Sequence, residues 1–170
     1  MADLSRATDS ARLVLRWARR YARSPGRGLA PSIAVLHATL DVPWCVAAQA
    51  LTALGVGPEA ISSQTRAAAT TTDPEGFDAP SAGAAEATRR ESPYLGTEHL
   101  LMGLVRDPNT GAARVLSACG VTADQVDAAV AACQSGPRPP LMWRARAALI
   151  WRDLRWLAGA ATDPTPRSPG

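Results

Sequence analysis

Histidine and cysteine have the widest chemical range of the side chains in this sequence, because they can act as metal ligands, nucleophiles or general bases. The chain has two histidines and three cysteines, namely His37, His99, Cys45, Cys119 and Cys133. No spacing among them matches a zinc-ligand motif, and the cysteines form no C-x-x-C pair. We therefore expect no catalytic residue, no metal site and no cofactor, a structural or partly exposed role for His99, and cysteines that act as small core residues.

Phosphate chemistry is limited by the absence of lysine, since all 18 basic residues are arginine. The phosphate-binding loop G-x-x-x-x-G-K-[ST] requires a lysine, so nucleotide hydrolysis by that loop is excluded. The arginine content accompanies heavy use of alanine and proline, which is typical of a GC-rich genome, and it is weak evidence for arginine-specific chemistry. We predict that the protein is not an enzyme.

The charge is distributed unevenly along the chain. The formal net charge is +3, but residues 1–30 and 137–170 are basic, whereas residues 31–136 are acidic. An acidic middle suits cationic ligands or complementary contacts with the basic ends. The odd number of cysteines, the lack of a secretory leader and the lack of any apolar stretch of membrane-spanning length favour a cytoplasmic location.

The elements that position these residues are expected to be helices. Alanine, leucine, valine and arginine dominate the composition and aromatic residues are few, which favours an all-α fold. From about Ala7 to Arg23, apolar residues follow three-four spacing and arginines line the opposite face. Further helices are predicted at about 32–41, 43–55, 58–69, 81–91, 97–107, 110–119 and 122–133.

Capping residues support these boundaries. Ser32, Thr97 and Thr122 have the side chains of N-cap residues, and we expect each to begin a helix. Pro43 is expected in the first turn of its helix, where the missing N–H has no cost.

The sequence contains an internal repeat, in which positions 47–56 align with positions 112–121 without a gap. Gly55 falls on Gly120 in this alignment, and each is placed to end a helix. We infer a tandem duplication of a four-helix unit. The predicted repeats, at about 7–69 and 81–134, form one domain of pseudo-twofold symmetry over residues 1–136, with a polar linker at 70–80.

The second copy contains the string Gly96-Thr97-Glu98-His99-Leu100-Leu101-Met102-Gly103-Leu104. This string resembles the repeat of the Clp N-terminal domain, which heads the ClpA and ClpC unfoldases of bacterial protein degradation. The resemblance extends over about 7–134 and is degenerate in the first copy, where Pro31-Ser32-Ile33-Ala34 takes the place of Gly96-Thr97-Glu98-His99. It implies a domain that receives protein or peptide clients and adaptors, here without ATPase modules.

The resemblance also implies a ligand site at Thr97 and Glu98. In the ClpC branch the glutamate of this motif, beside its threonine, binds phosphoarginine on marked substrates. A carboxylate suits the guanidinium group, and a helix N-terminus can help to hold the phosphate. The alternative is that Thr97 caps the helix and Glu98 complements its dipole, because the equivalent position, Ile33, has no acid.

The segment after residues 135–140 is rich in tryptophan and arginine. Its apolar stripe consists of Trp143, Ala147, Ile150, Leu154 and Leu157. We predict an amphipathic helix within residues 137–160 and a disordered tail at 161–170. The helix is expected to fold back on the repeat domain or to pair with a second copy. The alternative is docking to a partner or, less favoured, to an anionic membrane surface through Trp143, Trp151 and Trp156.

The sequence thus predicts a non-enzymatic protein- or peptide-binding module that acts as an accessory or decoy in Clp-dependent proteolysis. Its expected partners are protein or peptide clients and Clp unfoldase or protease components, and nucleic acid is not expected. One alternative is a scaffold or membrane-surface protein that works through the C-terminal helix. Another is a protein that sequesters small molecules directed at the Clp N-terminal domain.

Overall fold

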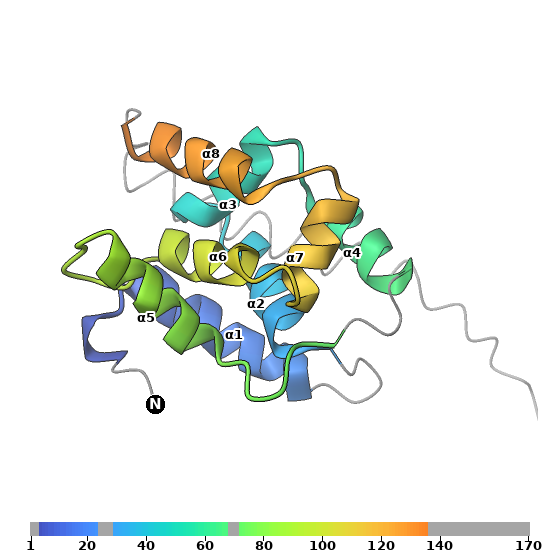
Figure 1. Cartoon of the computed structure of the whole chain (residues 1–170), viewed down its shortest axis with the longest axis horizontal. Helices are drawn as coiled ribbons and strands as arrows, with labels where there is room; N and C mark the ends of the chain where they lie inside the picture. Colours follow the sequence, from blue (N-terminus) through green and yellow to red (C-terminus); the bar gives the residue numbers. More distant parts are fainter. Residues whose placement is uncertain (1–3, 24–28, 68–71, 136–170) are drawn as a thin grey trace, which may run out of the picture. The chain divides into compact units, whose positions relative to one another are not determined.

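The computed structural model describes residues 4–23, 29–67 and 72–135. Within these ranges the regular elements are helices (Figure 1) and one isolated β-bridge between Ala7 and Leu95. The predicted all-α fold is confirmed. A 3₁₀ turn at Leu4–Arg6 is followed by α1 (Asp9–Arg23), α2 (Pro31–Leu40), α3 (Val46–Ala53), α4 (Pro58–Ala67), α5 (Ala79–Arg89), α6 (Thr97–Arg106), α7 (Gly111–Ala118) and α8 (Ala123–Ser135).

The chain divides into two units, Met1–Gly136 and Pro137–Gly170. The second unit lies outside the described residues, so the amphipathic helix with Trp143, Ile150, Trp151, Leu154 and Leu157 remains a prediction. Within the described ranges, none of the helices has the length and apolar character needed to cross a membrane.

The duplication is visible in the backbone in the same alignment as in the sequence. Helices α3 and α7 begin at the equivalent positions Val46 and Gly111, and both are eight residues long. Each is followed by a glycine of positive φ, +75° at Gly55 and +77° at Gly120. The next amide then donates back to a leucine carbonyl near the end of the helix, which is the same C-terminal capping motif in both copies.

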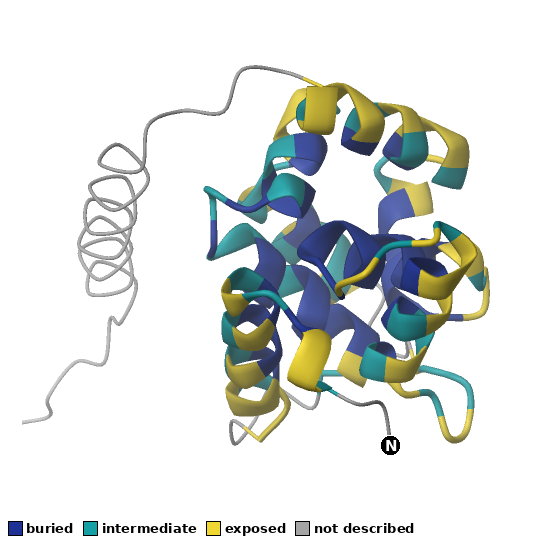
Figure 2. Ribbon diagram, turned by 90° about the vertical axis from the view of Figure 1, so that its left-hand side faces the viewer, coloured by how far each residue is buried: buried dark blue, intermediate teal, exposed yellow. Residues whose placement is uncertain are grey.

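The two copies interlock rather than lie end to end. Helix α1 packs on α2 and α5 packs on α6, but α3 contacts α8, and α4 contacts α7, across the copies. Buried residues gather inside the bundle and exposed ones cover its outer faces (Figure 2). Every residue from Thr97 to Val105 of α6 is buried. A helix buried on all sides needs neighbours all around it, so the motif in α6 lies at the centre of the domain.

Helices α5 and α6 approach each other closely at two glycines. A Cβ on Gly103 would lie 2.6 Å from the carbonyl carbon of Ala82, and one on Gly83 would lie 2.8 Å from a methyl carbon of Leu100. A side chain at residue 103 would meet the backbone of α5, and one at residue 83 would have to displace the Leu100 side chain, so the two glycines allow the close packing of α5 on α6.

Several sequence-based expectations are corrected. The N-caps of α2 and α6 are Ala30 and Gly96, so Ser32 and Thr97 lie inside the first helical turn. Pro43 precedes α3, whose N-cap is Cys45. Thr122 does cap its helix: its Oγ1 accepts from Gln125 N, and Gln125 Oε1 accepts from Thr122 N.

Two further expectations are wrong in detail. Helix α1 begins at Asp9 rather than at about Ala7, because Ala7 forms the isolated bridge with Leu95. Among the cysteines Cys45 is fully buried, whereas Cys119 and Cys133 are half-buried at the edge of the core.

Candidate ligand-binding site at two equivalent helix junctions

The two copies exchange one hydrogen bond in each direction. Ser32 Oγ in α2 accepts from Ala112 N in α7 at 2.9 Å, and Thr97 Oγ1 in α6 accepts from Ala47 N in α3 at 3.4 Å. Ser32 is equivalent to Thr97, and Ala47 to Ala112, in the alignment of the two copies. The first turns of two helices therefore meet at each of two equivalent places, the α2/α7 junction and the α3/α6 junction.

The α2/α7 junction is occupied by an aspartate of the linker. Asp73 Oδ2 accepts from Ser32 N at 2.7 Å, and Asp73 Oδ1 accepts from Gly111 N at 2.8 Å. Ser32 Oγ also donates to this carboxylate. One negative charge thus satisfies the free amides at the positive ends of two helices. This contact, between residues far apart in the sequence, was not predicted.

At the α3/α6 junction the equivalent amides are Thr97 N and Val46 N. No described residue accepts a hydrogen bond from either of them. The aligned amides therefore hold a carboxylate at one junction and, so far as the described ranges show, are two unused donors at the other.

The Glu98 side chain distinguishes the α3/α6 junction further. It is 6% exposed, and His99 Nδ1 lies 3.7 Å from its Oε1. His99 Nδ1 accepts from Gly96 N at 3.0 Å, so it presents no proton to Glu98. Burial lowers the pKa of His99, only partly offset by the Glu98 charge, which keeps the imidazole neutral near pH 7. Within the described ranges no cation and no hydrogen-bond donor contacts the carboxylate of Glu98, which is mostly buried but keeps some contact with solvent.

Gly96 provides the space that the carboxylate of Glu98 occupies. A Cβ at residue 96 would overlap both carboxylate oxygens and the carbon between them. Any other residue at this position has to displace the Glu98 side chain. The equivalent residue of the first copy is Pro31, which is followed by Ser32 and the apolar Ile33.

Cys45 completes the surroundings of Thr97 and Glu98, and sequence reasoning did not place it there. Its Sγ accepts from Ala48 N at 3.4 Å, as the Oγ1 of the equivalent Thr110 accepts from Ala113 N at 3.1 Å. Burial raises the pKa of the Cys45 thiol, and the Glu98 charge adds to this rise. Burial therefore favours the neutral thiol, whose Sγ caps α3. Its alignment with Thr110 was the signal that could have identified it.

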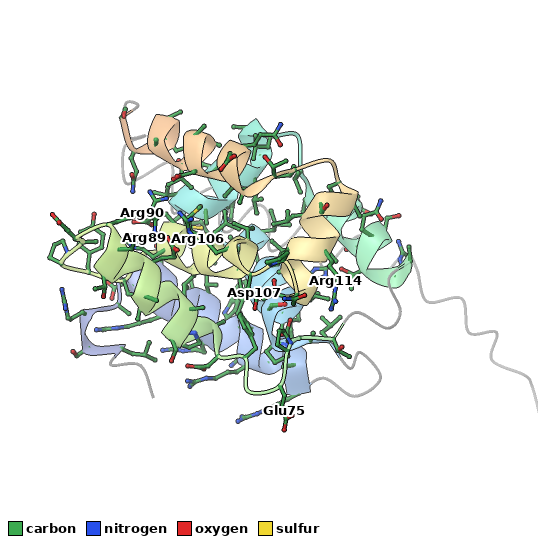
Figure 3. All side chains as sticks on the ribbon, in the orientation of Figure 1. Glu75, Arg89, Arg90, Arg106, Asp107 and Arg114 are labelled. Carbon is green, nitrogen blue, oxygen red and sulfur yellow. The ribbon has the colours of Figure 1, made fainter. Side chains whose placement is uncertain are left out.

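A second buried carboxylate, Glu86, is fully neutralised. Glu86 accepts from Arg89 at 2.9 Å and from Arg106 Nε at 2.6 Å, while Arg90 pairs with Asp127 of α8. The three arginines lie close together beside α5 and α6 (Figure 3). This cluster joins α5, α6 and α8, and its contrast with Glu98 shows that the fold does supply arginines to a buried acid where the acid is structural.

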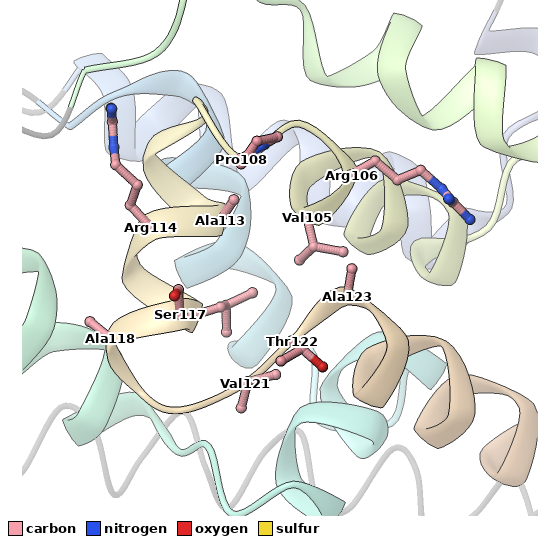
Figure 4. A pocket seen from close by; sticks show the side chains of 11 residues that line it. Val105, Arg106, Pro108, Ala113, Arg114, Ser117, Ala118, Val121, Thr122 and Ala123 are labelled. Atoms are coloured by element: carbon pink, nitrogen blue, oxygen red, sulfur yellow. The ribbon is translucent and has the colours of Figure 1, made fainter.

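A pocket of about 710 Å³ opens between α6, α7 and α8 (Figure 4). Its walls include Val105, Leu116 and Val121, and Arg106 and Arg114 lie among its lining residues. Neither Thr97 nor Glu98 lines it, and its lining contains no carboxylate, imidazole or thiol. Across the described ranges, no group of three or more histidine, cysteine, aspartate or glutamate side chains is arranged to hold a metal ion.

Comparison with protein families adds one result. Residues 80–138 match the family described as the Clp repeat (R) N-terminal domain. The match includes α5 to α8, and with them Thr97 and Glu98, and it confirms the resemblance for the second copy. No curated protein matches the chain.

Proposed function

Because residues 80–138 match the Clp repeat N-terminal domain, we propose that the protein is a non-enzymatic module that binds proteins and peptides through one phosphoarginine-type site at the α3/α6 junction. The observation that carries this proposal is the Glu98 carboxylate, which is 6% exposed and lacks a donor among the described residues. A carboxylate with little solvent contact and no cationic partner among the described residues suits a ligand that brings its own cation.

A guanidinium group fits this requirement better than an ammonium group. It offers several N–H donors in a planar fork that matches the two oxygens of a carboxylate. The fork replaces hydration that Glu98 has largely lost already, so little further desolvation of the protein is needed. Arginine side chains are therefore the expected cationic part of the ligand.

The two amides of the same junction account for the phosphoryl part. Thr97 N and Val46 N lie at the positive ends of α6 and α3, and such helix ends favour anions. At the α2/α7 junction the equivalent amides, Ser32 N and Gly111 N, already bind two oxygens of one anion, Asp73. A ligand with both a guanidinium and a phosphoryl group uses the acid and the amides together, whereas plain arginine uses the acid alone.

The test is a calorimetric titration with an arginine-phosphorylated peptide and its unphosphorylated counterpart. Binding should depend on the phosphoryl group, and Glu98→Gln should weaken it about 10- to 100-fold, because a hydrogen bond to a charged partner is lost. Glu59→Gln is the matched control, since Glu59 is also the second residue of a helix but is exposed. Equal binding of both peptides, or equal effects of the two substitutions, would contradict the proposal.

In the cell, this module would present marked clients to a Clp unfoldase or compete with it for them. The predicted C-terminal helix would bind a partner protein or a second copy of the chain through Trp143, Ile150, Trp151, Leu154 and Leu157. Deletion of residues 137–170 should then leave peptide binding intact and abolish only such association, as measured by calorimetry and light scattering. Loss of peptide binding on deletion would place recognition in the C-terminal segment instead.

A further inference from the structure

We propose that Asp73 is a built-in occupant of the α2/α7 junction, an autoinhibitory contact that closes a second anion site and limits the protein to one ligand. The inference goes beyond the proposed function, because it concerns the junction that carries no acidic motif. The limit of one ligand per chain rests on the proposed function. The closed anion site rests only on the contacts of Asp73.

The first argument is the way in which the carboxylate is bound. Asp73 contacts Ser32 N and Gly111 N at 2.7 and 2.8 Å, one oxygen on each helix, and Ser32 Oγ adds a third donor. The amides belong to helices of ten and eight residues. Two helix ends and a hydroxyl converge on one carboxylate, which is the chemistry expected for an oxyanion such as sulfate or phosphate.

The second argument is the equivalent junction. Thr97 N and Val46 N occupy the same positions as Ser32 N and Gly111 N, yet no described residue binds them. The described part of the chain therefore supplies an internal anion to one pair of amides and not to the other. Among the described residues Asp73 has no counterpart at the second junction, and it is supplied from outside both four-helix units by the linker.

The third argument is the attachment of the linker. Arg114 of α7 donates to the carbonyl oxygen of Thr72, the residue just before Asp73. Asp78 Oδ2 accepts from Ser81 N at 3.1 Å, which fixes the other end of the strap formed by residues 72–78. Glu75, between these anchors, is exposed and points away from the helices (Figure 3). The strap thus places one acid in the junction and leaves its neighbour in solvent.

The closed junction would take a different ligand from the open one. Ile33, which is 2% exposed, stands where Glu98 stands in the second copy, so no carboxylate is available for a guanidinium group. With Asp73 removed, the vacated junction should bind a simple oxyanion and should not distinguish phosphoarginine from inorganic phosphate.

The experiment compares the wild-type chain, Asp73→Ala and the matched control Glu75→Ala, with sodium sulfate as the probe and sodium chloride at equal ionic strength. Asp73→Ala should have a lower Tm than the wild-type chain. Sulfate at about ten times its Kd should raise the Tm of Asp73→Ala by about 3–6 °C. The Ser32 and Gly111 amide signals of Asp73→Ala should shift saturably, while those of wild type and Glu75→Ala should not. Asp73→Asn, which keeps the side-chain size, replaces Asp73→Ala if that variant does not fold.

Three results would overturn the inference. The first is an unchanged Tm in Asp73→Ala, because the contact would then have no energetic weight. The second is destabilisation without rescue by sulfate, which would make Asp73 a structural contact only. The third is a saturable shift of Ser32 and Gly111 in the wild-type chain, which would show an open junction. Thr97 and Val46 report the other site separately, so failure of the proposed function is distinguishable from each of these.

Discussion

At the α2/α7 junction the chain supplies its own anion, Asp73, beside the apolar Ile33, whereas at the α3/α6 junction it places the acid Glu98 beside two amides that no described residue uses. The two junctions join aligned segments of the chain, and a hydroxyl from α2 or α6 contacts the opposite copy at each. They differ in their side chains and in the start of the helix, because α2 begins one residue earlier in the alignment than α6.

This comparison shows how a duplicated fold can divide two requirements between its copies. Satisfied polar groups and a buried apolar side chain stabilise the first junction. A mostly buried carboxylate without a cation or donor among the described residues lowers stability, as groups in binding sites often do. Under the proposed function, the first copy contributes to stability and the second carries the recognition site.

The largest expected effect comes from giving the first junction the acid of the second. Ile33→Glu should reduce the free energy of unfolding by about 3–5 kcal/mol, because it buries an unpaired charge next to the residue that binds Asp73. Urea denaturation measures the loss.

The double variant Ile33→Glu with Asp73→Ala tests whether the two acids compete for that junction. It should be more stable than the sum of the single changes implies, with a coupling energy of about 1–3 kcal/mol. If Ile33→Glu is as stable as the wild-type chain, the two junctions do not differ in the way described.

A smaller effect separates the two exchanged hydrogen bonds. Ser32→Ala removes an acceptor at 2.9 Å from Ala112 N and a donor to Asp73. It should lower the free energy of unfolding by about 1–3 kcal/mol. Thr97→Val keeps the shape of the side chain and removes a longer hydrogen bond, at 3.4 Å from Ala47 N. The free energy of unfolding should therefore fall by about 1 kcal/mol or less. Both are measured by chemical denaturation, and the reverse order of the two losses would show that the second junction is the more structural one.

The regular parts of the fold could be predicted because local signals determine them. Gly55 and Gly120 end their helices as expected, and the alignment that pairs these glycines also relates the backbones of the two copies. The hydroxyls of Ser32 and Thr97 misled the assignment of caps, since each is used in a contact 80 or 50 residues away along the chain. No local pattern indicates such a contact.

The candidate site shows the same limit. Thr97 and Glu98 could be selected from one motif, but the burial of Glu98 depends on tertiary packing around α6. Asp73 lies in a polar segment that sequence alone identifies only as a linker. Its role depends on how the linker lies across two helices from different copies, which is a property of the folded chain.

The smallest effect is a pH dependence that belongs to the second junction only. Burial lowers the pKa of His99, so below about pH 6.5 the unfolded chain takes up a proton that the folded chain does not. The stability present above that pH should therefore decrease as the pH falls through the lowered pKa of His99. His99→Asn, which can still accept from Gly96 N, should remove this part of the dependence in thermal unfolding between pH 7 and 5. The equivalent residue of the first copy, Ala34, has no titratable group, so an unchanged pH profile in His99→Asn would assign the effect elsewhere.

The most direct measurement of the difference between the junctions is a titration of the ¹⁵N-labelled protein with phosphoarginine, followed through four backbone amides. Thr97 and Val46 should shift and saturate with a single Kd, while Ser32 and Gly111, held by Asp73, should remain in place. Equal shifts at all four amides, or shifts at none, would contradict one open and one closed junction.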